Sequence, residues 1–185
     1  KTVWLGGNIG TPLLSFIPQM EPDHFAVVEL SSFQLMDMER SAQRAVITNL
    51  APNHLDVHKD MDEYILAKTN VFNFQNEDGL LIVNADNAIT APMVGKGETR
   101  YFSRQKKLEN GVYLADGVIY RAKNGVSEKV MDSSLILLPG IHNVENYMTA
   151  IAVTDGLVSD ESIRKVAQTF GGVEHRIELV RVKDG

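Results

Sequence analysis

Three short apolar runs constrain the fold of this chain more than any other feature of its sequence. FAVVEL, RAVITNL and GLLIVNAD are continuous rather than alternating, and a segment with helical spacing, Met61 to Gln75, lies between the second and the third. Strands that are covered on both faces of a parallel sheet have this continuous pattern. Strands that alternate with helices favour an open, mostly parallel α/β sheet with helices on both faces.

The two ends of the chain add further elements to this central pattern. TVWL predicts a first strand, and GGNIGTP predicts a turn into a helix that opens with Thr11 as cap and Pro12 as first residue. Later, TRYFSR, GVYLADGVIYRAKNGVSEKVM and LILLP are half-polar and separated by Gly- and Asn-marked turns, which predicts a small antiparallel patch. HNVENYMTAIAVTDGL and SDESIRKVAQTF predict two helices, the second capped by Ser159 or Asp160, and VEHRIELVRVKDG predicts a last strand.

Composition excludes several classes of function. The formal charge of −6, without a stripe of Lys and Arg, argues against a nucleic-acid surface. The chain has no cysteine, so disulfides and thiolate metal sites are excluded, and we expect a cytoplasmic protein. No apolar run approaches the roughly 20 residues that span a bilayer, so we expect no membrane insertion. The first residues lack a Met and lie almost inside a strand, which suggests a fragment of a longer protein.

Four of the predicted strands end in polar clusters. These are GGN at Asn8, ELSS at Glu29, TNLAPNHLDVH from Asn49 to His58, and NADN from Asn84 to Asn87. The carboxyl ends of parallel strands lie along one edge, and open α/β sheets bind their ligands at that edge. Four such endings are better explained by a shared ligand site than by four unrelated loops.

Within these clusters, His54 is the first candidate for a metal ligand. Two histidines with an aspartate between them, as in HLDVH, can build a metal site or can hydrogen-bond locally. Asp56 and His58 are better suited to supporting a ligand or to facing solvent. Because thiolates are missing and carboxylates and amides are near, Mg²⁺ or Mn²⁺ fits better than structural zinc.

Four further positions carry weaker signals. Lys68 lies between apolar positions of a predicted helix, where its ammonium can reach water or where burial can lower its pKa. Asn143 and Asn146 are three residues apart at a helix start, a spacing suited to a purine edge or to plain capping. Arg176 in EHRIE can bind phosphate or pair with a neighbouring glutamate.

Taken in order, GGNIGTP, ELSSFQL, TNLAPNHLDVHKDMDEYILAK, NAD, GIHNVEN and GGVEHRIE resemble the central domain of the Mur ligases. These are ATP-dependent amino-acid ligases of peptidoglycan synthesis, and the resemblance covers essentially the whole chain. It implies a P-loop-type sheet. ELSSFQL is most similar to the family member that adds D-glutamate to UDP-N-acetylmuramoyl-L-alanine.

The resemblance also implies roles for individual residues. Glu29 matches a Mg²⁺-binding carboxylate near the ATP phosphates, His54 a histidine of a second metal site, and Lys68 a lysine carried as a carbamate. The substrate-side matches are Asn8 and Ser31. On the nucleotide side, the matches are Asn143, Asn146 and Arg176.

The implied reaction is phosphoryl transfer followed by acyl transfer. A substrate carboxylate attacks the γ-phosphate of ATP to give an acyl phosphate, and the amine of D-glutamate then displaces the phosphate. The family's GKT phosphate loop would precede Lys1, and its next domain would begin near Leu179. We therefore assign residues 1–178 to the central ATP-binding domain and 179–185 to the start of the next. We expect the isolated chain to have no ligase activity and weak ATP affinity.

Other functions stay open from the sequence. One is a sister Mur ligase or a relative of folylpolyglutamate synthetase, which a panel of amino acids would separate from a D-glutamate ligase. A second is a two-metal phosphohydrolase built on HLDVH and Glu29, which would hydrolyse its substrate without ATP. A third is a nucleotide-binding module without catalysis.

Overall fold

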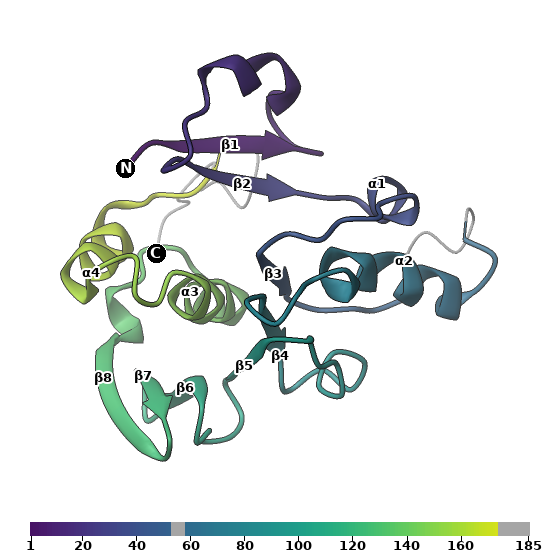
Figure 1. Cartoon of the computed structure of the whole chain (residues 1–185). Helices are drawn as coiled ribbons and strands as arrows, with labels where there is room; N and C mark the ends of the chain where they lie inside the picture. The colour runs from purple at the N-terminus through teal and green to yellow at the C-terminus, as the bar shows by residue number, and fades with distance from the viewer. Residues whose placement is uncertain (53–57, 174–185) are drawn as a thin grey trace, which may run out of the picture. The chain divides into compact units, whose positions relative to one another are not determined.

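The computed structural model describes residues 1–52 and 58–173. The chain divides into two compact units. The first comprises Lys1–Ala42 and Pro52–Phe74, and the second comprises Gln43–Ala51 and Gln75–Gly185. Each unit has a sheet of its own, with two strands in the first unit and six in the second (Figure 1).

The sheet of the first unit is a parallel pair, β1 (Val3–Gly7) and β2 (Phe25–Glu29). The segment between them forms η1 (Leu13–Gln19), a 3₁₀ helix and not the helix predicted to open with a Thr11 cap. Its N-cap residue is Pro12, and no side chain caps it. The prediction that β2 is covered on both faces is also wrong, since four of its five residues are exposed. A two-stranded sheet offers little surface against which apolar side chains can be buried.

Two helices complete the first unit, α1 (Ser32–Met36) and α2 (Met61–Asn73). The predicted helical spacing from Met61 is confirmed, and the side chain of Asp60 caps α2 by accepting a bond from the Glu63 amide. The buried face of α2 consists of Tyr64, Ala67 and Phe72, while α1, which packs on α2, buries Leu35. Helix α1 has only 5 residues, so this packing must stabilise it.

The second unit contains one mixed sheet in sequence order. Its strands are β3 (Arg44–Ile47), β4 (Leu80–Asn84), β5 (Glu98–Ser103), β6 (Gly111–Ala115), β7 (Val118–Lys123) and β8 (Val126–Asp132). Strands β3 to β6 are parallel, and β6 to β8 form an antiparallel meander. The predicted α/β class with a mostly parallel sheet and an antiparallel patch is confirmed. TRYFSR was wrongly assigned to that patch, because β5 pairs in parallel with β4 and β6.

Two helices pack on this sheet, α3 (Ile141–Val153) against β3 to β6 and α4 (Asp160–Thr169) against β8 (Figure 1). Ser159 caps α4, as predicted. LILLP is not a strand: η2 (Ser133–Leu135) ends within it, and Leu137 is exposed. The predicted last strand, from Val173, lies almost wholly outside the described residues. In the described part of the chain, no helix combines the length and apolar character that a membrane span requires.

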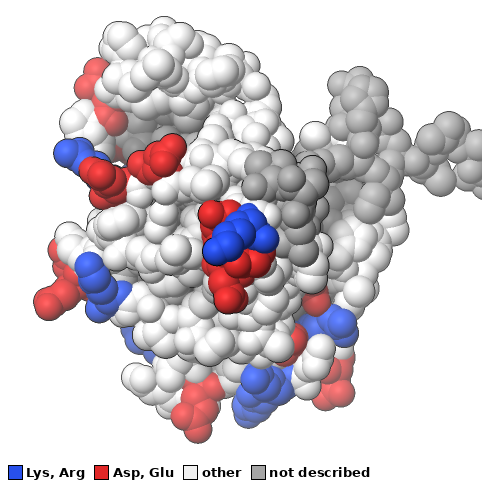
Figure 2. Space-filling model, turned by 90° about the vertical axis from the view of Figure 1, so that its right-hand side faces the viewer, with Lys and Arg blue, Asp and Glu red and all other residues white. Residues whose placement is uncertain are grey.

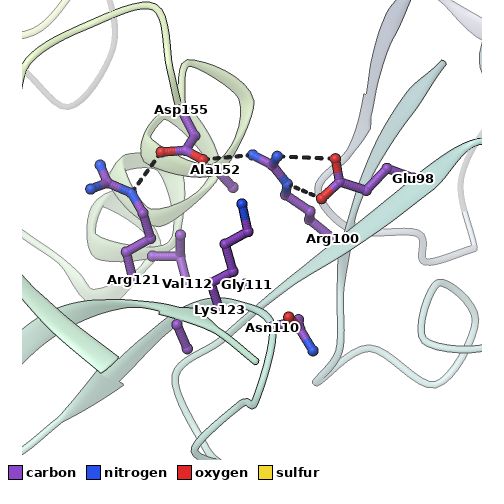
Figure 3. Close-up of a pocket in the computed structure, with 10 residues that line it drawn as sticks. Glu98, Arg100, Asn110, Gly111, Val112, Arg121, Lys123, Ala152 and Asp155 are labelled. Atoms are coloured by element: carbon purple, nitrogen blue, oxygen red, sulfur yellow. Dashed lines mark hydrogen bonds and ion pairs between the residues drawn. The ribbon is translucent and has the colours of Figure 1, made fainter. Parts of the chain in front are cut away.

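Charged side chains lie in small groups of mixed sign on the face shown in Figure 2. One network joins β5, β7 and the end of α3: Asp155 accepts from Arg100 and pairs with Arg121, both at 2.9 Å (Figure 3). Arg100 also binds Glu98 at 2.6 Å, which lowers the Glu98 pKa, so this pair loses its stabilising effect as the pH falls through that lowered value. The cavity beside the network measures about 50 Å³, room for a few water molecules and not for a nucleotide.

Replacing Asp155 with alanine is expected to destabilise the protein by about 1–3 kcal/mol, between the values for exposed and for buried ion pairs. The reason is that Arg100 and Arg121, with side chains 22% and 20% exposed, would lose a shared partner. Urea unfolding followed by circular dichroism measures the effect. Asp132→Ala is the matched control, because Lys129 and Asp132 form an exposed pair for which we expect less than about 1 kcal/mol. Equal losses in both variants would contradict the prediction.

Candidate functional site

The carboxyl edge of the first sheet brings Asn8 and Glu29 together. Glu29 is the last residue of β2, and the Asn8 amide donates to the Glu29 carbonyl at 2.8 Å. Gly7 makes this approach possible: its φ is +113°, and a Cβ at this position would lie 2.2 Å from the Glu29 carbonyl oxygen. Both candidate side chains are exposed at this edge.

Ser31 caps the helix that follows β2. Its hydroxyl accepts from the Gln34 amide at 3.2 Å, and the Gln34 side chain accepts from the Ser31 amide at 2.9 Å. This reciprocal capping box fixes the turn that carries the predicted substrate residue. The Ser-x-x-Gln pattern of this capping box is present in ELSSFQL, so the sequence contains the signal for it.

Lys68 reaches the same turn from helix α2. Its Nζ donates to the Leu30 carbonyl at 3.3 Å, directly after Glu29 in the chain. Partial burial lowers the Lys68 pKa, and the negative charge of Glu29 opposes that shift. The structure therefore brings together two of the three predicted metal-site residues. His54, the third, lies outside the described residues.

The chemistry of this donor set fits a magnesium ion only in part. An exposed carboxylate such as Glu29 is a suitable oxygen ligand, whereas a lysine ammonium is not a ligand at all. A carbamate on Lys68 would convert the amine into a second carboxylate, and the lowered pKa favours the neutral amine from which carbamates form. Within residues 1–52 and 58–173, no three His, Cys, Asp or Glu residues are grouped as a metal site.

His58 has a place that its sequence position did not indicate. It was predicted to support a ligand or to face solvent. Its side chain is fully buried and lies 2.9 Å from the Ser32 hydroxyl. Solvent exposure is thus excluded. The partner Ser32 was not singled out from the sequence, because a contact across 26 residues depends on tertiary packing.

The nucleotide-side candidates that the structure describes belong to the second unit. The Asn143 side chain donates to the Pro139 carbonyl at 2.8 Å, and the Asn146 side-chain nitrogen donates to the Asn143 side-chain oxygen at 3.3 Å. The N-cap residue of α3 is Gly140, and no side chain caps this helix, so the Asn143 bond ties the helix start to the preceding loop and is not a cap. Asn146 is exposed. Arg176 lies outside the described residues, as does Asp56.

The four polar strand ends are distributed over the two sheets. Asn8 and Glu29 share one edge, as described above. At the carboxyl ends of β3 and β4, Asn84 donates to the Asn49 side chain at 2.9 Å. In each of these two pairs of neighbouring parallel strands, a hydrogen bond therefore connects the polar residues at the two carboxyl ends.

Comparison with known proteins identifies the family of this chain. The family model described as the Mur ligase middle domain matches residues 5–154. The chain belongs to this family. As a Mur ligase middle domain, it is 49% identical over 184 residues to the UDP-N-acetylmuramoylalanine--D-glutamate ligase of Acetivibrio thermocellus, covering 98% of the chain and 40% of that protein. The enzyme of the same name from Clostridium beijerinckii is 50% identical, with 98% of the chain and 39% of that protein covered.

Solved structures support the same family fold. A UDP-N-acetylmuramoyl-L-alanyl-D-glutamate--2,6-diaminopimelate ligase matches with a TM-score of 0.64 and 22% identity, over 86% of the chain and 35% of that protein. A pseudomurein peptide ligase type C from Methanothermus fervidus matches with a TM-score of 0.65 and 16% identity, over 96% and 50%. At these identities the likeness concerns the fold alone. The Mur ligase middle domain described here spans about 40% of the length of its curated relatives.

Proposed function

We propose that this chain is the central ATP-binding part of a ligase that joins D-glutamate to UDP-N-acetylmuramoyl-L-alanine. The observation that carries the proposal is the Lys68 amine bound to the Leu30 carbonyl, next to Glu29, at the carboxyl edge of a parallel sheet. The choice of D-glutamate is supported by relatives of that name with 49–50% identity along 98% of the chain, and by the ELSSFQL segment. Residues 1–178 would form the domain and 179–185 the start of the next.

In the proposed reaction, a carboxylate oxygen of the muramoyl substrate attacks the γ-phosphorus of ATP, and the bond to the departing ADP oxygen breaks. The amine of D-glutamate, after losing a proton, attacks the resulting acyl carbon, and inorganic phosphate leaves. Bound Mg²⁺ offsets the repulsion between the carboxylate and the triphosphate. Glu29, His54 and Lys68, the last as a carbamate, are the proposed metal-holding and catalytic residues.

The remaining proposed roles concern binding. Asn8 and Ser31 would contact the muramoyl substrate, and the capping box keeps the Ser31 turn in place before substrate arrives. Asn143 and Asn146 would contact the adenine, and Arg176 the nucleotide. An enzyme with these substrates belongs to the cytoplasm, where the nucleotide-linked precursors of peptidoglycan and ATP are available.

Phosphate release by the full-length protein tests the proposal. With ATP, Mg²⁺ and UDP-N-acetylmuramoyl-L-alanine, we expect release that depends on D-glutamate and not on L-lysine or meso-diaminopimelate. Use of another amino acid would identify a sister ligase, and hydrolysis without ATP would favour the metal phosphohydrolase. The isolated chain of 185 residues is expected to release no D-glutamate-dependent phosphate, and measurable release would contradict the proposed division into domains.

A further inference from the structure

His58 and Ser32 form a buried polar contact beside the candidate site. The residues are 2% exposed each, and the imidazole Nε2 lies 2.9 Å from the Ser32 hydroxyl oxygen. The imidazole ring also stacks on Phe33, with centroids 5.4 Å apart and planes 4° apart, and it contacts Tyr64 at 5.3 Å. The ring is therefore held in one orientation by aromatic packing on two sides.

The second ring nitrogen of His58, Nδ1, lies near a carboxylate. A Glu63 carboxylate oxygen lies 3.6 Å from Nδ1, and the same oxygen accepts from the Lys59 amide at 2.7 Å. Among the described residues, Nδ1 has no hydrogen-bond partner. The Ser32 hydroxyl can donate to Nε2 or accept from it, so the two side chains form a hydrogen bond in either tautomer of the imidazole.

The contact matters because α1 cannot hold its own position. A helix of five residues is too short to be stable without packing. Three side chains of the segment from His58 to Asn70 make polar contacts to the end of β2 and to α1. These contacts join His58 to Ser32, Lys68 to the Leu30 carbonyl, and Asn70 to the Leu35 and Met36 carbonyls at 3.0 and 3.3 Å.

The first two of these contacts enclose Ser31. Leu30 and Ser32 are its neighbours in the chain, and Leu30 follows Glu29 directly. Lys68 therefore holds the turn on one side of Ser31, and His58 holds it on the other. The third contact, from Asn70, lies at the far end of α1 and away from this turn.

We propose that His58 is a positioning residue, which binds Ser32 and so fixes the turn from Glu29 to Ser32 against α2. The turn carries the Glu29 carboxylate and the Ser31 hydroxyl, and α2 carries Lys68. The imidazole thus sets where the Glu29 carboxylate stands relative to the Lys68 amine. The inference rests on the proposed function in so far as these two groups hold a metal ion.

Four single variants of the full-length protein, and the double variant of Ser32→Ala with His58→Phe, test this role. Ser32→Ala removes the hydroxyl, His58→Phe keeps an aromatic ring without nitrogen, and His58→Gln keeps a polar atom near the place of Nε2. Asn70→Ala is the matched control, because it removes another polar contact between α1 and α2. Titration with MnCl₂, followed by the EPR signal of free Mn²⁺, measures metal binding without catalysis. Thermal unfolding and kcat are measured on the same samples.

Ser32→Ala and His58→Phe are each expected to weaken Mn²⁺ binding about 10-fold, as changes to groups that orient metal ligands commonly do. The double variant should lose no more Mn²⁺ affinity than the single variant that has the larger loss, because both changes remove the same bond. His58→Gln should restore most of the binding. Asn70→Ala should lower the unfolding temperature and leave Mn²⁺ binding at the wild-type level.

If Ser32→Ala and His58→Phe both bind Mn²⁺ as tightly as the wild type, the proposal is overturned, and the contact between the two residues contributes only to packing. Additive losses in the double variant would also overturn the proposal. Ser32→Ala keeps the imidazole in place, so the test survives if His58→Phe fails to fold. D-glutamate-dependent phosphate release by the wild type is measured in parallel, and its absence would refute the proposed reaction while the Mn²⁺ titrations still decide the role of His58.

Discussion

Replacing Lys68 with methionine in the full-length protein is expected to lower D-glutamate-dependent phosphate release by about 100-fold to 1000-fold, the range for losing one group that stabilises transition-state charge. Methionine keeps an unbranched side chain at this position of α2 and removes the amine that could become a carbamate. In the structure that amine lies at the Leu30 carbonyl, where a carboxylate in its place would stand beside Glu29. Initial rates over a range of Mg²⁺ concentrations measure the effect.

The same lysine predicts a dependence on CO₂ and on pH. Carbamylation joins the neutral amine nitrogen to the carbon of CO₂ and releases one proton, so it requires the uncharged form. Burial lowers the Lys68 pKa, and a lowered pKa increases the uncharged fraction at any pH below it. We therefore expect activity to fall in CO₂-free buffer, to recover with bicarbonate, and to recover more fully as the pH rises toward that pKa.

Protein stability should move in the opposite direction from activity in the Lys68→Met variant. Because the folded-state pKa is lowered, the charged ammonium destabilises the fold below that pKa; the penalty decreases as the pH rises through it and is gone above the pKa of the unfolded chain. The methionine variant should therefore unfold at the same temperature as the wild type or at a higher one. Lys59→Met, at an exposed position just before α2, is the control and should keep full activity. An active Lys68→Met enzyme would remove the lysine from the proposed mechanism.

Strand β4 could be predicted from the sequence because its burial is uniform. All five residues of β4 are buried, so its apolar run was sufficient to identify it. Strand β5 is predicted in the wrong part of the sheet because polar residues such as Arg100 give TRYFSR a half-polar appearance. In the structure Arg100 pairs with Glu98 and Asp155, a tertiary feature that alternation of residue types cannot reveal.

The candidate site was predictable to a similar extent. Glu29 stood out because a charged residue ends an apolar strand, and Lys68 because a charged residue lies among apolar helix positions. Their mutual approach depends on how α2 packs beside the end of β2, which no local pattern encodes. The buried pair of His58 and Ser32 has the same origin, since each residue alone resembles an ordinary polar loop or helix-start residue.

Replacing Glu29 with glutamine in the full-length protein is expected to lower the rate by about 100-fold at low Mg²⁺, with partial recovery at high Mg²⁺. The side chain keeps its size at the exposed end of β2 and loses the charge that suits a hard cation. Because the Glu29 side chain is exposed, the unfolding temperature should stay close to that of the wild type. Mg²⁺ saturation curves with and without the substitution measure the effect.

The charge of Glu29 also acts on Lys68, and this provides a second measurement on the same variant. Glu29 raises the Lys68 pKa against the lowering effect of burial, so its removal should lower that pKa further. The bicarbonate-dependent part of the activity should then appear at lower pH in Glu29→Gln than in the wild type. Glu39→Gln, a change at an exposed glutamate just after α1, should alter neither the Mg²⁺ requirement nor the pH profile. If Glu29→Gln and Glu39→Gln have the same Mg²⁺ requirement and the same pH profile, then Glu29 neither binds the metal ion nor raises the Lys68 pKa. The proposed metal-binding role of Glu29 would then be wrong.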